Sequence, residues 1–189
     1  MMARRLFLLG FAAALLTALG CSSSGGDGGA SPAIACVDGG AAAANAITMT
    51  CAGATDSTTE LVNVVLGGPA SGTTSLRGLN FDVTYDPSKL TFVSATNYTG
   101  GPFSTGALVP ATALPLDPTP HVVVSIQQVG GDPDVVIGAG QQVVMLHLSF
   151  ARAPAATFGP TPLEFVNAEA TVASPAITFA SVSGLALSY

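Results

Sequence analysis

The chain has 189 residues, of which 49% are apolar and only 8% carry a charge. This composition supports one domain with a proper core and excludes disorder over most of the length. The formal net charge is −6, and Lys89 is the only lysine in the sequence. Because nucleic-acid binding depends on clustered Lys and Arg side chains that neutralise phosphates, nucleic acid is excluded as a partner.

Residues 1–20 have the pattern of a signal peptide. Arg4 and Arg5 form a basic start, and an apolar run follows from Leu6 to Leu16. The run has the length of the apolar part of a signal peptide and is too short for a membrane-spanning helix. We therefore expect export, with residues 1–20 removed before the mature chain folds.

The end of this run reads TALGC at residues 17–21. A small residue directly before a cysteine resembles the lipobox of bacterial lipoproteins, in which that cysteine is acylated and becomes the new N-terminus. The resemblance implies a lipid anchor at Cys21 in the cell envelope. Ser22 rather than Asp follows, which by the same resemblance favours the outer over the inner membrane if the cell is Gram-negative. The alternative is an ordinary secretory peptide with an incidental cysteine.

Residues 21–35 are rich in Gly and Ser and are expected to form a flexible tether. The thirteen residues from Cys21 to Ala33 span about 20 Å, which lifts a small domain just clear of a membrane surface. The folded domain is then expected over residues 36–189.

The two cysteines of this domain are predicted to form a disulfide. If Cys21 is acylated, Cys36 and Cys51 remain, and an oxidising envelope favours their pairing. Closing a loop of about 15 residues stabilises a fold by roughly 3 kcal/mol in the chain-entropy model. Free thiols and a metal site are the alternatives, although two Cys and two distant His make a poor zinc site.

The domain is expected to be all-β. Runs with period-two alternation are separated by turn residues, and no window of a dozen residues shows helical periodicity. About nine short strands in this length indicate an antiparallel β-sandwich. The predicted strands cover residues 46–51, 60–66, 78–85, 90–96, 121–129, 142–152, 163–166, 176–182 and 184–188.

The alternation also assigns faces, because successive side chains of a strand point to opposite sides. In residues 78–85 it places Leu79, Phe81, Val83 and Tyr85 in the core and leaves Asn80, Asp82 and Thr84 outside. In residues 142–150 the same rule directs Val144, Leu146, Leu148 and Phe150 inward and Met145, His147 and Ser149 outward. One sheet face is therefore expected to be polar and open to a partner.

Residues 78–90, GLNFDVTYDPSKL, resemble the signature of cohesin domains, in which an alternating strand ends in Tyr-Asp-Pro and resumes with Leu. The likeness continues in TFVSA at 91–95, in the strand from Val143 to Phe150 and in SVSGLAL at 181–187. It covers roughly residues 46–189. The resemblance implies a nine-stranded jelly-roll sandwich.

Cohesins of cellulose-degrading complexes bind calcium-loaded dockerin domains through one sheet face. The resemblance therefore implies a non-catalytic docking module with a protein partner, possible calcium entering only through that partner, and no cofactor or metal of its own. Two partner-contacting positions of the family fall at Gly78 and Asn80, of which only Asn80 keeps the polar character. The candidate contact residues are Asn80, Asp82 and Thr84, with His147 as a further interface candidate.

Two other functions remain open from the sequence. Tyr98 and Phe103 lie in the Gly-rich stretch NYTGGPFSTG and could stack on a sugar ring, as in a polysaccharide-binding module. Against this, the chain has no Trp, and the two rings could simply cap the open end of the sandwich. The third function is that of a structural component of the envelope.

Enzymatic activity is not expected. His121 and His147 lie in no nucleophile, metalloprotease or paired-carboxylate motif. The segment Asp132-Pro133-Asp134, with Asp117, could hold a cation, but a solvated hairpin turn accounts for it better. Asp86 before Pro87 is likewise best explained as a turn residue whose side chain bonds the backbone two residues on.

Overall fold

The computed structural model describes residues 34–38, 40–103, 109–114, 120–154, 156, 159–171, 179 and 182–188. The expected signal peptide, Cys21 and Asp117 lie outside these described residues. The chain divides into units 1–30 and 31–189, and everything described below belongs to the second unit. Within the described part, there is no helix long and apolar enough to cross a membrane.

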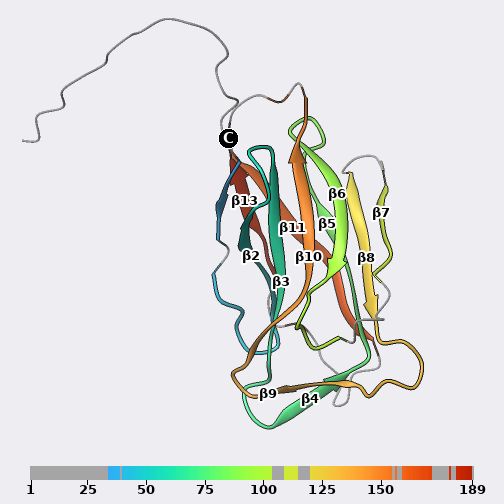
Figure 1. Ribbon diagram of the computed structural model, residues 1–189. Coiled ribbons are helices and arrows are strands. Elements are labelled where there is room, and N and C mark those ends of the chain that lie inside the picture. The colour runs from blue at the N-terminus through green and yellow to red at the C-terminus, as the bar shows by residue number, and fades with distance from the viewer. Residues whose placement is uncertain are drawn as a thin grey trace, which may run out of the picture. The chain divides into compact units, whose positions relative to one another are not determined.

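The described residues contain thirteen strands (Figure 1). They are β1 (Ala35–Val37), β2 (Ile47–Ala54), β3 (Thr59–Gly67), β4 (Thr73–Leu76), β5 (Gly78–Thr84), β6 (Leu90–Asn97), β7 (Ala111–Leu114), β8 (His121–Gln127), β9 (Val135–Gly138), β10 (Gln142–Arg152), β11 (Thr161–Thr171), β12 (Val182–Ser183) and β13 (Leu185–Ser188).

Two large sheets form the sandwich. One has the order β1-β13-β11-β5-β8-β7, and the other has the order β12-β2-β3-β10-β6. Strands β4 and β9 form a separate two-stranded sheet, at the foot of the sandwich in Figure 1. The expected all-β sandwich is confirmed. The described strand pairs are antiparallel apart from β12 with β2, which is parallel and departs from the fully antiparallel prediction.

The core lies between the two large sheets. Leu79, Phe81 and Val83 of β5 are at most 1% exposed, so the predicted inward face of this strand is correct. Phe81 meets Phe165 edge to face at 5.2 Å between ring centroids, and Tyr85 meets Phe150 at 5.6 Å. Such pairs add about 0.5–1.5 kcal/mol to the free energy gained from burial alone. The inner face of β5 is therefore fixed by aromatic packing.

The prediction for β10 is wrong at Met145. This side chain is fully buried, whereas Val144, which was expected in the core, is only half-buried. The pairing of β10 with β3 shifts between Val144 and Leu146, which marks a β-bulge. A bulge adds one residue to a strand and reverses the alternation beyond it. Ser149, predicted outside, is also buried at 8% exposure.

Four strands were not predicted: β1, β4, β7 and β9. Each has only three or four residues, and β4 lies in a stretch rich in Gly and Thr, a composition that is typical of loops. Strand β11 is also longer than predicted. Its pairing with β5 shifts between Val166 and Glu169, and Asn167 has a φ of 56°, so the alternation breaks in its middle.

A disulfide joins Cys36 of β1 to Cys51 of β2, with 5.8 Å between the Cα atoms. β1 lies at the edge of the six-stranded sheet and β2 belongs to the other large sheet. The bond therefore ties the first strand of the domain across the sandwich. Since β1 pairs over only three residues with β13, the disulfide supplies much of its attachment.

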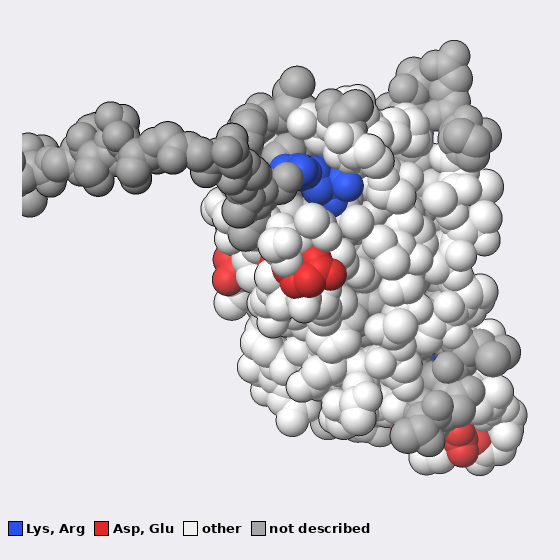
Figure 2. Space-filling model, turned by 45° about the horizontal axis from the view of Figure 1, so that its top comes forward, with Lys and Arg blue, Asp and Glu red and all other residues white. Residues whose placement is uncertain are grey.

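Charged side chains are sparse on the surface. The face in Figure 2 shows one basic group and a few small acidic groups on an otherwise uncharged surface. This distribution agrees with a chain in which only 8% of residues are charged.

Candidate functional site

The candidate site is the outer side of β7, β8, β5 and β11, which we call the open face. The alternation of β5 turns Asn80, Asp82 and Thr84 to this side, and all three are half-buried by their neighbours. On β8, the residues opposite them are Ser125, Val123 and His121 in the same order. Directly opposite residues in an antiparallel pair share a face, so these six side chains lie on one surface.

Hydrogen bonds tie the polar residues of the open face to the neighbouring strands. Asn80 accepts a bond of 2.6 Å from the Ser125 hydroxyl on β8 and donates one of 3.0 Å to the Thr171 hydroxyl on β11. Asn167 donates to the Asp82 carboxylate at 3.0 Å. These contacts hold the side chains in fixed positions, so the face is preorganised.

An apolar row crosses the same face. Asp82 lies opposite Val123 on β8 and opposite Val166 on β11, and Val123 lies opposite Thr112 on β7. Val123 is 37% exposed and Val166 is 39% exposed, values that are high for valine in the middle of a sheet. A carboxylate between two exposed valines suits a partner that brings both apolar and cationic or hydrogen-bonding groups.

The open face is acidic. No Lys or Arg occurs in β5, β7, β8 or β11, whereas Asp82, Glu164 and Glu169 all lie on β5 and β11. An acidic face repels acidic partners and favours the approach of a basic one.

Gly78, which departs from the polar character expected at this position, begins β5 and is buried. A Cβ atom added there would lie 2.7 Å from the carbonyl oxygen of Ile126. The backbone of β8 therefore occupies the space that a side chain would need. The loss of a polar side chain at this position follows from strand packing.

The remaining candidate residues lie elsewhere. Tyr98 follows β6 and is 36% exposed, and its ring meets that of His147 on β10 edge to face at 5.0 Å. His147 lies in the other large sheet and Tyr98 directly follows a strand of it, so they do not join the open face. Phe103 is only 4% exposed and belongs to the core, so the prediction that it offers an exposed ring is wrong. It closes the core instead, which was the alternative interpretation.

His147 is half-buried, and its Nδ1 atom is buried without a hydrogen-bond partner. Burial lowers the pKa of this imidazole below its ordinary value. The ring is therefore neutral at physiological pH and packs against Tyr98. This arrangement corresponds to a packing role, and it provides neither a charged contact nor an activated base.

Asp86 forms the turn that ends β5. Its Oδ1 accepts a bond of 2.9 Å from the backbone N–H of Ser88 and one of 2.6 Å from the Ser88 hydroxyl. The backbone N–H groups of Lys89 and Leu90 donate to the Asp86 carbonyl at 3.1 and 2.9 Å. The abrupt stop at Tyr-Asp-Pro thus has a local cause, since the side chain caps the turn and the chain re-enters the sandwich at Leu90.

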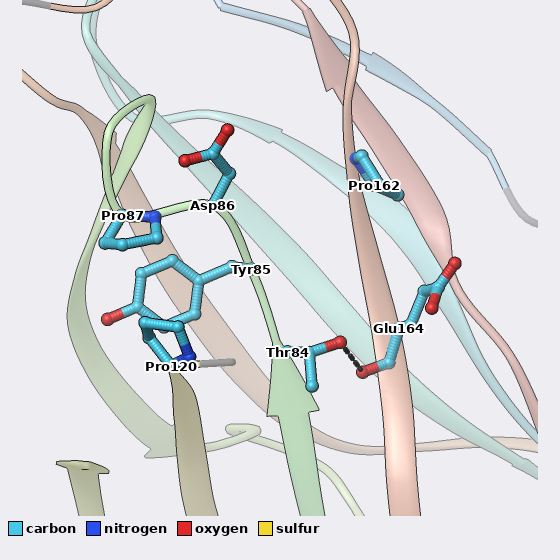
Figure 3. A pocket seen from close by; sticks show the side chains of 7 residues that line it. All are labelled: Thr84, Tyr85, Asp86, Pro87, Pro120, Pro162 and Glu164. Atoms are coloured by element: carbon cyan, nitrogen blue, oxygen red, sulfur yellow. Dashed lines mark hydrogen bonds between the residues drawn. The ribbon is translucent and has the colours of Figure 1, made fainter. Parts of the chain in front are cut away.

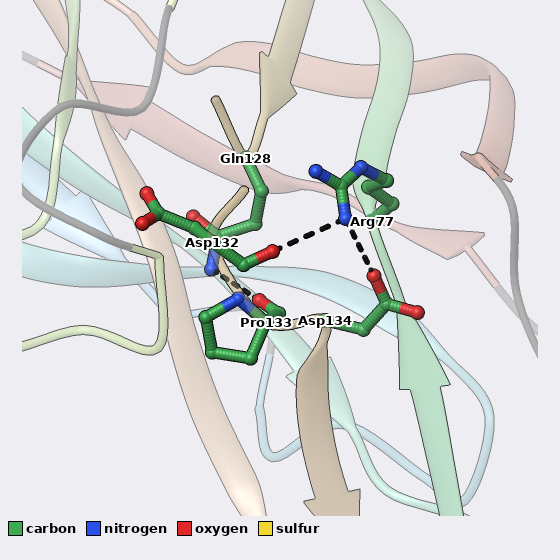
Figure 4. A network of polar contacts seen from close by, with 5 residues as sticks. All are labelled: Arg77, Gln128, Asp132, Pro133 and Asp134. Carbon is green, nitrogen blue, oxygen red and sulfur yellow. Dashed lines mark hydrogen bonds and ion pairs between the residues drawn. The ribbon is translucent and has the colours of Figure 1, made fainter. Parts of the chain in front are cut away.

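The Asp132-Pro133-Asp134 turn is held by Arg77 (Figure 4). The guanidinium donates to the Asp134 carboxylate at 2.9 Å and to the Asp132 carbonyl at 3.2 Å, and the Gln128 amide donates to the Pro133 carbonyl at 3.1 Å. With Asp134 engaged in an ion pair, the turn joins β8 to β9 as a structural element. The described residues include no group of three or more His, Cys, Asp or Glu placed to hold a metal ion.

Comparison with known proteins identifies the fold. No protein-family model matches the sequence, and neither does any curated protein. Among solved structures, the sixth cohesin of scaffoldin B from Acetivibrio cellulolyticus, solved with a Cel5 dockerin, matches with a TM-score of 0.52 and 14% identity, over 74% of this chain and 95% of that chain.

CaCohA2 from Clostridium acetobutylicum, solved in solution, matches with a TM-score of 0.51 and 16% identity, over 74% of this chain and 88% of that chain. At such identities the likeness defines the fold. The chain has a cohesin-like β-sandwich, and the resemblance inferred from the Tyr-Asp-Pro segment is confirmed at this level.

Sequence reasoning found the polar half of the open face and missed the apolar half. Val123 and Val166 look like ordinary strand residues, and only the pairing of three strands shows that they flank Asp82. The sequence did hold one signal for Val123: it alternates with Val122 and Val124, so it must point outward where they point inward. Val166 carried the same signal, since it alternates with Leu163 and Phe165, but nothing in the sequence shows that β11 lies beside β5.

Proposed function

We propose that the protein is a non-catalytic docking module that binds a protein partner through the open face. The observation that carries this proposal is the row formed by Val166, Asp82 and Val123 across three strands. Exposed apolar side chains at the centre of a rigid, hydrogen-bonded polar surface are typical of protein interfaces. The cohesin of Acetivibrio cellulolyticus was solved in complex with a dockerin, which supports a dockerin-like partner for this chain.

The proposal includes an anchor. The signal-like segment at residues 1–20, the cysteine at position 21 and the Gly/Ser-rich stretch after it support export, acylation and display of the domain on a flexible tether at the cell envelope. In this arrangement the lipid holds the module at the membrane and the open face captures a soluble protein. The module would thus recruit its partner to the envelope.

Capture from the organism's own exported proteins tests the docking function. The purified protein is immobilised beside two variants, Val123→Lys on the open face and Val93→Lys on β6 of the other sheet. Val93 is 54% exposed, so the two changes are chemically matched. A partner retained by the native protein and by the Val93 variant, but lost with the Val123 variant, supports the proposal. Retention by all three would place the contact elsewhere.

A second function is favoured by one observation. A cavity of about 440 Å³ lies beside Tyr98 and is lined also by Gly101, Pro102, Gln142 and Val144. Its size suits a sugar ring, and Tyr98 supplies an aromatic wall. Binding of the protein to a polysaccharide array that is lost in Tyr98→Ala, without any protein capture, would favour this function over docking.

A further inference from the structure

A pocket lies at one end of the open face, where β5 turns and β11 begins. Its volume is about 360 Å³. Figure 3 shows Asp86 and Pro87 on one side and Pro162 and Glu164 on the other. Thr84 donates from its hydroxyl to the Glu164 carbonyl at 3.3 Å, so β5 and β11 are joined directly beneath the opening. The pocket is therefore continuous with the surface that carries Asn80 and Asp82.

The walls of the pocket are rigid and apolar. Tyr85 contributes its ring, and three prolines line the space from separate segments: Pro87 in the turn after β5, Pro120 directly before β8, and Pro162 on β11. Proline has a fixed φ and no N–H group, so these walls offer flat hydrocarbon surface without hydrogen-bond donors. A pocket lined by one aromatic ring and three proline rings binds a flat or unbranched side chain better than a bulky polar one.

The polar groups at the rim are carboxylates. Asp86 accepts two bonds from Ser88, and these bonds, with a smaller contribution from the nearby Lys89, lower the pKa of its carboxyl group. The Asp86 side chain is therefore ionised at neutral pH. Glu164 lies across the opening and is exposed, and its carboxylate points away from Asp86 in Figure 3. Lys89 does not line the pocket, and its ammonium donates to the Pro160 carbonyl at 3.3 Å.

We infer that this pocket receives an arginine side chain of the protein partner that docks on the open face. The aliphatic stem and flat guanidinium would lie against Tyr85 and the prolines, and the charge would meet the Asp86 carboxylate. The exposed Glu164 side chain would turn toward the charge by a change of rotamer. Charge complementarity supports this occupant, because the four strands of the open face contain no Lys or Arg and the whole chain has a net charge of −6. The inference rests on the proposed docking function and specifies the chemistry of the partner.

The test uses a probe peptide and needs no identified partner. The ¹⁵N-labelled protein is titrated with acetyl-Gly-Arg-Gly-amide and, separately, with the same peptide containing citrulline, the neutral isostere of arginine. The arginine peptide should shift the amide signals of Tyr85, Asp86 and Glu164 and bind with a Kd of about 1 mM, typical of one small side chain in a shallow site. The citrulline peptide should bind at least about fivefold more weakly, because it lacks the charge.

Three variants make the result specific. Asp86→Asn keeps an oxygen that can accept the Ser88 bonds, and Glu164→Gln keeps the shape of the side chain. Each variant should bind the arginine peptide about fivefold more weakly than the native protein does. Asp56→Asn, in the turn between β2 and β3 of the other large sheet, is the matched control and should have no effect, because Asp56 accepts the same pair of bonds from Thr58 that Asp86 accepts from Ser88. Equal binding of both peptides, shifts confined to other residues, or no shift at about 10 mM peptide would overturn the inference.

The two proposals fail separately. If the arginine peptide does not bind but the Val123→Lys variant still loses a captured protein, the docking function stands and the pocket is not its arginine site. If the peptide binds the pocket while Val123→Lys leaves binding of the captured protein unchanged, the pocket recognises a cationic side chain and the open face is not the docking surface.

Discussion

Val123 lies directly across the β5–β8 ladder from Asp82, and both side chains point away from the core. Val123→Lys would place an ammonium opposite the Asp82 carboxylate, a favourable cross-strand pair worth about 0.2–1 kcal/mol. The free energy of unfolding should therefore stay within about 0.5 kcal/mol of the native value or rise slightly. Binding of a basic partner should weaken by at least tenfold, because the new charge repels it and removes an apolar contact.

The measurement combines urea unfolding with a binding assay on the captured partner. Val93→Lys on the other sheet should leave both quantities unchanged, since Val93 is already 54% exposed and lies away from the open face. If Val123→Lys unfolds the protein, or if it leaves partner binding intact, the assignment of this valine to the interface is wrong.

Gly184 separates β12 from β13, and a Cβ atom there would lie 1.7 Å from the Leu163 carbonyl oxygen. Backbone cannot move aside as a flexible side chain can, so Gly184→Ala should lower the free energy of unfolding by about 2 kcal/mol or more. Gly130→Ala is the matched control, because a Cβ atom at Gly130 meets nothing within 4 Å. Urea denaturation of the two variants should give clearly different midpoints; equal midpoints would contradict the close approach of β11.

The Cys36–Cys51 bond closes a loop between residues 15 apart in the sequence and joins the two large sheets through β1 and β2. The double variant Cys36→Ser with Cys51→Ser should lose about 3 kcal/mol of unfolding free energy, mainly because the unfolded chain is no longer constrained. Denaturant unfolding of the native protein with and without a thiol reductant provides the comparison. A loss below about 1 kcal/mol would show that β1 is held by its pairing with β13 instead.

The regular parts of the fold could be predicted because their hydrophobic alternation is uninterrupted. β5 shows this best, since Leu79, Phe81 and Val83 are all buried where parity placed them. The same rule failed where the backbone adds a residue. Met145 enters the core at a bulge in β10, and the alternation of β11 breaks after Val166. Bulges depend on pairing with other strands and leave no reliable mark in a single sequence.

The candidate site shows the same limit. Asn80, Asp82 and Thr84 could be placed on an outer face from β5 alone. The pocket at Asp86 could not, because its walls come from three segments that only the sheet order brings together. Phe103 was misplaced because a Gly-rich sequence describes a loop and does not say whether its aromatic ring turns inward.

The proposed lipid anchor predicts a specific modification. Cells that express the full chain should incorporate labelled palmitate into the protein, and Cys21→Ala should abolish the label, because the acylated cysteine would be absent. The variant should also move from the membrane fraction to the soluble fraction, since several acyl chains, each methylene contributing about 0.8 kcal/mol, hold the native protein. Equal labelling of both proteins would refute the anchor at this residue.

The buried imidazole of His147 predicts a pH dependence of stability. Burial lowers the pKa of His147 in the folded protein below the ordinary value of 6.5. Between these two values the unfolded chain binds more protons than the folded one, so the free energy of unfolding should fall as the pH drops below about 6.5. Above that pH the stability from this residue is fully present, because the imidazole is neutral in both states.

His147→Gln removes the titrating group while keeping a polar side chain of similar size beside Tyr98. The difference in the free energy of unfolding between the native protein and the variant reports on His147 alone, because the carboxylates titrate in both proteins. Urea unfolding between about pH 5 and 8 should show a steeper loss of stability toward acid for the native protein. Burial explains why the neutral form is kept, since protonation would place a charge where water is excluded. Parallel curves for the two proteins would contradict this account.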